Sequence, residues 1–222
     1  MADGTILTDR LPYLDIAKGI GIILVVIGHC IPDAASPAGI PVPAMKVLHD
    51  VIYSFHMPLF FFISGFLISR KVGSIQSKKT LITKKIKRLL IPYFFVGLCY
   101  APLKLLLSQF ANKPYDFNNL WKIFLGVNPD GELWFLYALF MISLIAIVLN
   151  KQVSKIGLGI AGILTLTSPV LPIVTSYIFY FFLGIYMREN APQYFERMKI
   201  STAILYAGIF SGINLAVLVL GE

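Results

Sequence analysis

Long apolar stretches alternate with short polar segments along the whole chain. Seven stretches of 15 to 22 residues come close to the roughly 20 apolar residues that a membrane-spanning helix needs. They cover residues 16–32, 51–69, 89–110, 133–150, 156–171, 173–187 and 200–220. This pattern predicts an all-α bundle of about seven transmembrane helices, forming one domain over residues 1–222.

The composition supports a membrane protein. Hydrophobic residues make up 57% of the chain, charged residues 14%, and the mean hydropathy is +0.79. A soluble domain carries about 25% charged residues, so these values indicate a chain that crosses the membrane several times.

Basic residues are distributed unevenly between the two sets of connecting segments. If the N-terminus is cytoplasmic, 15 of the 19 Lys and Arg residues lie on the cytoplasmic side. The positive-inside rule therefore predicts a cytoplasmic N-terminus and, with seven spans, an external C-terminus. Since the basic residues gather in cytoplasmic segments, the net charge of +8 requires no nucleic-acid partner.

The first apolar stretch contains ionisable residues on one predicted face. Lys18 and His29 are eleven residues apart, which places them about 20° apart around a helix and roughly 16 Å apart along its axis. Asp15 lies about 40° from His29. Each ionisable group at membrane depth costs about 2.5 kcal/mol or more, so such groups usually face a bundle interior and mark a site. The alternative is a lysine that extends to the membrane surface beside an unrelated polar histidine.

A second candidate site lies in the segment between the second and third spans. Eight basic residues and no acidic one occur from Arg70 to Arg88. Lys85 and Arg88 share a helix face, and a helix that begins near them would offer free N–H groups to a phosphate. The segment is predicted to bind a phosphorylated cytosolic donor. Equally, it can anchor the chain to anionic lipid, worth about 1 kcal/mol per charge.

The second span contains His56, Pro58 and the pair Ser64-Gly65. Pro58 can bend the helix, and Ser64-Gly65 permits close approach of another helix. His56 is expected near the depth of His29, and taken alone it is better explained as a packing residue than as a catalyst. The two cysteines, Cys30 and Cys99, show no metal-binding or redox spacing, so no metal site is expected.

At these positions the chain resembles the acyltransferase-three family of integral-membrane enzymes, which O-acylate sugars and other envelope carbohydrates. The similar segments follow the order of the family. They are Tyr13–Gly19 followed by His29, His56–Phe66, Lys85–Tyr93 and Glu132–Leu136. The segment His56–Phe66 is the most specific match. The family usually has arginine at position 85 and often has histidine where this chain has Glu132.

The resemblance implies transfer of an acyl group, usually acetyl, from cytoplasmic acyl-CoA to a hydroxyl of a carbohydrate or glycolipid in a bacterial-type cytoplasmic membrane. Acyl-CoA would be a co-substrate, and no bound cofactor is expected. Lys85 and Arg88 would bind the phosphates of CoA. His29, with an ordinary pKa near 6.5, would be the general base, with Lys18 and Asp15 as its companions in the catalytic set. The further residues expected to line the site are His56, Ser64, Glu132 and Trp134.

Two other functions are compatible with the residues. The chain could be a transporter or flippase for a lipid-linked or phosphorylated solute, with Lys18 and His29 as a coupling relay. It could also be a non-catalytic remnant of the acyltransferase fold. Because the resembled family commonly has more helices, the chain is expected to lack its last helices and not to be a complete active enzyme by itself. The sequence indicates neither the acceptor nor the oligomeric state.

Overall fold

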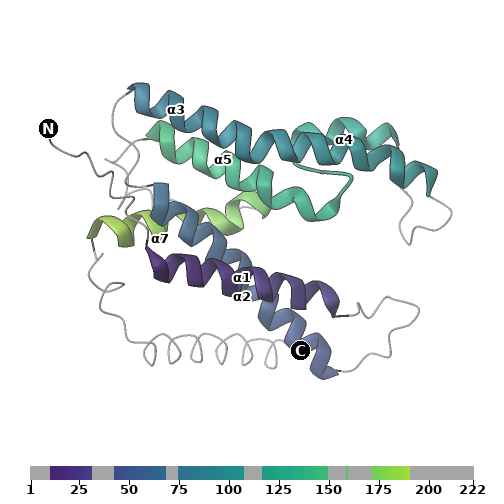
Figure 1. Ribbon diagram of the computed structural model, residues 1–222, viewed down its shortest axis with the longest axis horizontal. Helices are drawn as coiled ribbons and strands as arrows, with labels where there is room; N and C mark the ends of the chain where they lie inside the picture. The colour runs from purple at the N-terminus through teal and green to yellow at the C-terminus, as the bar shows by residue number, and fades with distance from the viewer. Residues whose placement is uncertain are drawn as a thin grey trace, which may run out of the picture. The chain divides into compact units, whose positions relative to one another are not determined.

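The structure, a computed structural model, describes residues 11–31, 43–68, 75–107, 117–149, 159 and 172–190. Every element of regular secondary structure in these ranges is a helix (Figure 1). The all-α prediction is therefore confirmed for the described part of the chain. The span predicted at 200–220 lies outside the described residues, as does the span at 156–171 apart from position 159.

Four of the described helices are long and apolar enough to cross a membrane. They cover Pro12–Cys30, Met45–Ile68, Ser77–Leu106 and Gly131–Leu149, with mean hydropathies from 1.6 to 2.3. They overlap the first four predicted spans. Helix α7 (Pro172–Asn190) covers the span predicted at 173–187. The count of seven spans and the cytoplasmic N-terminus stay predictions.

The chain divides into two compact units, Met1–Ile63 with Gln193–Glu222, and Ser64–Pro192. In the first unit, α1 (Pro12–Cys30) lies against α2 (Pro43–Ile68). A Cβ added at Gly21 would lie 2.9 Å from the ring of Phe60, and one added at Gly28 would lie 3.0 Å from the ring of Tyr53. The two helices are therefore antiparallel and closely packed. The buried α1 residues Leu14, Gly21 and Gly28 are seven apart and form one stripe.

In the second unit, one helical run extends from Ile75 to Leu106 (Figure 1). It consists of α3 (Ile75–Lys85), the π-helical turn η2 (Ile86–Leu90) and α4 (Ile91–Leu106). The expectation that a helix begins near Lys85 and Arg88 is therefore wrong. No glycine or proline interrupts residues 75–91, and the Lys, Leu and Ile side chains there permit a helix, so the basic segment continues into the apolar one without a break.

Helix α5 (Trp134–Leu149) is the central helix of the second unit. It contacts α3, η2 and α7, and its buried residues, which include Ala138, Phe140, Ile142 and Ser143, point in several directions around its axis. The 3₁₀ helices η4 (Phe117–Leu125) and η5 (Gly131–Leu133) lead into it. The segment between them lies against α4, where Asn128 Nδ2 donates a hydrogen bond to the Tyr93 carbonyl at 2.9 Å.

A single glycine sets how closely α7 approaches the last turns of α2. A Cβ added at Gly65 would overlap the carbonyl oxygen and carbonyl carbon of Phe181. Phe181 is fully buried, and its clashing atoms belong to the backbone, so a side-chain rotation cannot relieve the overlap. Any residue larger than glycine at position 65 must push the two helices apart.

We therefore expect Gly65→Ala to lower the free energy of unfolding by about 2 kcal/mol, as overpacking in a closed interface does. Thermal unfolding in detergent, followed by circular dichroism, measures the change. Gly131→Ala is the matched control, because an added Cβ there meets no atom within 4 Å. Equal midpoints for the two variants would contradict the proposed contact.

Candidate functional site

Three histidines gather around Tyr53 in the first unit, and they are all the histidines in the chain. The ring centroid of Tyr53 lies 4.1 Å from that of His49, 4.9 Å from that of His56 and 5.8 Å from that of His29. His49, Tyr53 and His56 come from α2, whereas His29 comes from the last turn of α1. We call these four residues the histidine–tyrosine cluster.

Close packing at Gly28 brings the two helices together at this cluster. Since Gly28 has no side chain, the Tyr53 ring can lie directly against the α1 backbone. His29 is the next residue along α1, and its Nε2 is 3.5 Å from the Tyr53 hydroxyl. The predicted site residues His29 and His56 are thus brought to the same place, on either side of a tyrosine.

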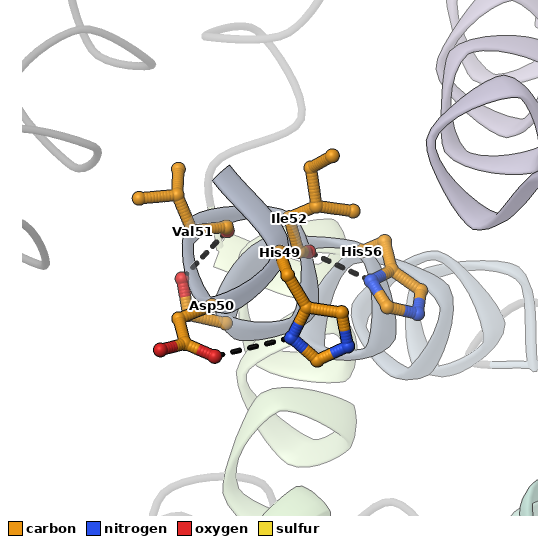
Figure 2. Close-up of polar contacts among 6 residues, drawn as sticks. His49, Asp50, Val51, Ile52 and His56 are labelled. Carbon is orange, nitrogen blue, oxygen red and sulfur yellow. Dashed lines mark hydrogen bonds and ion pairs between the residues drawn. The ribbon is translucent and has the colours of Figure 1, made fainter. Parts of the chain in front are cut away.

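Hydrogen bonds to Nδ1 fix the protonation pattern of the rings. Nδ1 of His29 lies 2.8 Å from the Val25 carbonyl oxygen. Nδ1 of His56 lies 2.7 Å from the Ile52 carbonyl oxygen, as Figure 2 shows. A carbonyl oxygen can only accept, so each Nδ1 carries the hydrogen. In the neutral ring Nε2 then has a lone pair and can receive a proton.

His49 has a carboxylate partner. Its Nδ1 is 3.1 Å from Oδ1 of Asp50, and both side chains are part-exposed (Figure 2). A carboxylate at Nδ1 also places the neutral ring's lone pair on Nε2. The pair therefore adds a second imidazole with a defined hydrogen-bond partner to this cluster.

His49, Asp50 and Tyr53 were not among the site residues predicted from the sequence. The spacing of His49, Tyr53 and His56, at i, i+4 and i+7, puts them on one helix face and could have identified the two additional ring residues. It could not show which α1 residue they meet, because that depends on how the two helices dock.

Asp15 and Lys18 lie near the other end of α1 from His29. Lys18 Nζ is 3.5 Å from Asp15 Oδ1, and the two side chains are 37% and 42% exposed respectively. His29 is also exposed. The residues of the predicted stripe therefore form two separate groups. One is an ion pair near the start of α1, and the other is an imidazole in its last turn, roughly 16 Å away along the helix.

A cationic pocket of about 200 Å³ lies in the second unit. Its walls are the last turns of α2 and the α3–η2 run. Eight residues line it: Ser64, Leu67, Ile68, Leu81, Lys84, Lys85, Arg88 and Leu89. Three predicted site residues, Ser64, Lys85 and Arg88, therefore meet at one place. None of the eight lining residues is acidic.

The helix geometry explains why these cations share the pocket. Leu81, Lys84, Lys85 and Arg88 are spaced i, i+3, i+4 and i+7, which is one helix face. Lys84 was not predicted as a ligand, although this spacing contains it. Like charges three or four residues apart destabilise a helix by about 0.2–0.5 kcal/mol per pair, so a bound anion would relieve repulsion as well as form contacts.

The π-helical turn η2 contains Arg88 and lies just before a proline. The Ile91 N–H donates to the Ile86 carbonyl, a bond that spans five residues rather than four. Pro92, at the next position, has no N–H and cannot complete the α-helical pattern. Such π-turns often occur at functional sites, and this one lies beside the pocket.

Glu132 and Trp134 do not line this pocket. Tyr93, near the start of α4, contacts Tyr137 with ring centroids 5.5 Å apart, whereas Lys104, near its end, donates to the Pro129 carbonyl at 3.0 Å. Helices α4 and α5 are therefore antiparallel, which places Glu132 at the opposite end of α4 from Arg88. Trp134 contacts Tyr177 of α7, with centroids 5.4 Å apart.

Among the described residues, no group of three or more His, Cys, Asp or Glu side chains is arranged to hold a metal ion. The histidine–tyrosine cluster is therefore not such a group. It places imidazole rings next to a phenol, an arrangement that suits proton transfer.

We expect all three neutral histidines to adopt the Nδ1–H tautomer, because each Nδ1 faces an oxygen acceptor. Nitrogen-15 NMR of the imidazole rings, at a pH where they are uncharged, measures the tautomer directly. Asp50→Ala should release His49 to a mixture of tautomers and leave His29 and His56 unchanged. A dominant Nε2–H form at His29 would contradict the geometry.

Comparison with known proteins identifies the family. A search of the curated proteins and a search of the solved structures found no match. The family model described as an acyltransferase domain matches residues 11–221, nearly the whole chain, and it contains every segment on which the resemblance was based. The predicted family is confirmed: the chain belongs to the acyltransferase-domain family of membrane proteins.

Proposed function

We propose that this protein transfers an acyl group, of the acetyl type, from acyl-CoA to a hydroxyl of a cell-envelope carbohydrate or glycolipid. Family membership supports acyl transfer. The observation that carries the choice of donor is the cationic pocket, where Lys84, Lys85 and Arg88 face Ser64. CoA is a thiol carrier with several phosphate charges, and a pocket with three cations and no acidic lining residue suits it.

The pocket fits the phosphate end of the donor. Its volume of about 200 Å³ is below the about 300–1,000 Å³ of sites that enclose a whole drug-sized ligand. We therefore assign it to phosphate groups, with the remainder of acyl-CoA extending out of it. Arg88 offers a bidentate fork to a phosphate, whereas Lys84 and Lys85 act as point charges. The Ser64 hydroxyl can donate a further hydrogen bond.

His29 is the best candidate for the general base. Its ring is exposed and can be reached by a substrate, whereas His56 is only 2% exposed. The 3.5 Å separation between Nε2 and the Tyr53 hydroxyl is at the long limit of a hydrogen bond, so an acceptor hydroxyl can replace that contact at little cost. His56 and Tyr53 then position the His29 ring, and the His49–Asp50 pair lies beside them.

The reaction needs two proton transfers, one from the acceptor hydroxyl and one to the sulfur of the departing CoA. The acceptor oxygen bonds to the acyl carbon while its proton passes to Nε2 of His29. The carbon–sulfur bond of the thioester then breaks, and CoA takes up a proton and leaves as the thiol. Tyr53 and the imidazoles supply hydrogen-bond partners for these transfers without any further reactant.

We assign the Asp15–Lys18 pair to the cytoplasmic end of α1. This assignment rests on the predicted cytoplasmic N-terminus, and it places Lys18 on the side from which acyl-CoA arrives. Asp15 balances the lysine charge, as their 3.5 Å contact allows. The protein would act in the cytoplasmic membrane of a bacterial-type cell.

The role of His29 is tested by His29→Ala in the full-length protein. General-base catalysis contributes about 10²–10⁴-fold, so acyl transfer should fall by about 100-fold or more while membrane insertion is retained. Mass spectrometry of envelope glycans, in cells with and without the gene, detects the acyl group and compares the variants. Val26→Ala is the control, since Val26 is apolar, 57% exposed and about 60° from His29 around α1. Wild-type acylation in His29→Ala would make His29 structural.

The donor site is tested with single alanine variants at Lys84, Lys85 and Arg88. Each lost charge-assisted contact should cost about 1.4 kcal/mol, which raises the KM for acyl-CoA about tenfold. Lys87→Ala is a matched control from the same turn, because Lys87 is exposed and does not line the pocket. Small, equal effects at all four positions would indicate lipid anchoring instead.

A further inference from the structure

Arg188 is a buried cation that neither the cationic pocket nor the histidine–tyrosine cluster uses. It lies in the last turn of α7 and is 6% exposed. Its two terminal nitrogens, Nη1 and Nη2, are buried and have no hydrogen-bond partner in the described part of the chain. Arginine is almost never fully buried unless it is paired, because a buried charge needs a counter-charge or hydrogen-bond acceptors.

An aromatic ring holds the guanidinium but leaves its donors unsatisfied. The central carbon of the Arg188 guanidinium lies 4.9 Å from the centroid of the Phe66 ring. A cation–π contact of this kind stabilises the positive charge, but an aromatic ring supplies no oxygen acceptor. Nη1 and Nη2 therefore still require hydrogen-bond acceptors.

Arg188 belongs to a different place from the cationic pocket. Ser64, Leu67 and Ile68 line the pocket from one side of α2. On a helical wheel Phe66 points roughly opposite to the mean direction of these three residues. Arg188 contacts the Phe66 ring and therefore lies beyond the other face of α2. It is not one of the residues that line the cationic pocket.

Neighbouring groups do not neutralise the charge. No ion pair involving Arg188 is present among the described residues. Glu189 is exposed and, as the adjacent residue, points about 100° away around the helix. The helix dipole favours a cation in the last turn, but it supplies no acceptor for Nη1 and Nη2.

We propose that Arg188 binds a phosphate group. The planar fork suits bidentate contact with two phosphate oxygens. Arg188, Glu189 and Asn190 end an otherwise apolar helix, which is where a membrane helix reaches the headgroup layer and where basic residues between helices bind lipid phosphates. The source is either an anionic phospholipid or a phosphate of the soluble donor, and the chemistry of recognition is the same.

The test uses the full-length protein and measures thermal unfolding midpoints. One arm compares nanodiscs of phosphatidylcholine with and without phosphatidylglycerol. The other titrates adenosine 3′,5′-bisphosphate, a phosphate-bearing fragment of CoA, in detergent. We expect a saturable rise in the wild-type midpoint in at least one arm, and the arm in which Arg188→Gln loses that rise identifies the source. Arg188→Gln should lose that rise, and without ligand it should be no less stable than wild type, because an uncompensated buried charge is gone.

Arg188→Lys keeps the charge but not the fork, so its apparent affinity should fall about tenfold. This variant decides the question if Arg188→Gln does not fold. Lys87→Gln is the surface control and should behave as wild type. The proposal is overturned by no rise for wild type in either arm, by a rise that is equal in wild type and Arg188→Gln in both arms, or by unchanged affinity in Arg188→Lys in the arm that depends on Arg188. Because the readout is binding, it is independent of whether the protein transfers acyl groups.

Discussion

Close approach of neighbouring helices to α2 is the constraint on which the histidine–tyrosine cluster and the burial of Arg188 depend. In the first unit, Gly28 lets Tyr53 lie against α1 and so brings His29 into the cluster. In the second unit, Gly65 lets the α7 backbone contact α2 at Phe181. That contact also aligns α7 so that Arg188 lies over the Phe66 ring. A methyl group at either glycine would push these side chains apart.

The ionisable groups of these apolar helices are satisfied in different ways. Asp15 pairs with Lys18, and His29 and His56 donate to carbonyl groups of their own helices. A neutral, hydrogen-bonded imidazole avoids the cost of a buried charge. The lysines and arginine of the cationic pocket instead stand close together without an acidic lining residue. The first arrangement stabilises the helices, whereas the second is more readily explained by a ligand that carries negative charge.

The two sites have complementary chemistry for the proposed reaction. The cationic pocket offers positive charge to the phosphates of a donor, and the histidine–tyrosine cluster offers imidazole lone pairs to an acceptor hydroxyl. Both sites contain residues of α2, on which Ser64 follows His56 by eight residues. The segment from His56 to Phe66, the most specific of the matches on which the resemblance was based, therefore contributes to both.

Local information in the sequence determined the helices and much of the chemistry. Apolar length predicted the four membrane-compatible helices, and the spacing of Lys85 and Arg88 predicted a shared face, because both properties follow from the geometry of a single helix. The motifs predicted the family. The helix boundary expected near Lys85 was wrong, since positive charge alone does not end a helix where residues 75–91 contain no glycine or proline. Only the tertiary structure decided that His49 and Tyr53 meet His29, that Ser64 joins Lys85 and Arg88, and that Arg188 is buried over Phe66. Each of these contacts joins two helices, and the periodicity of one helix does not specify which face of another lies against it.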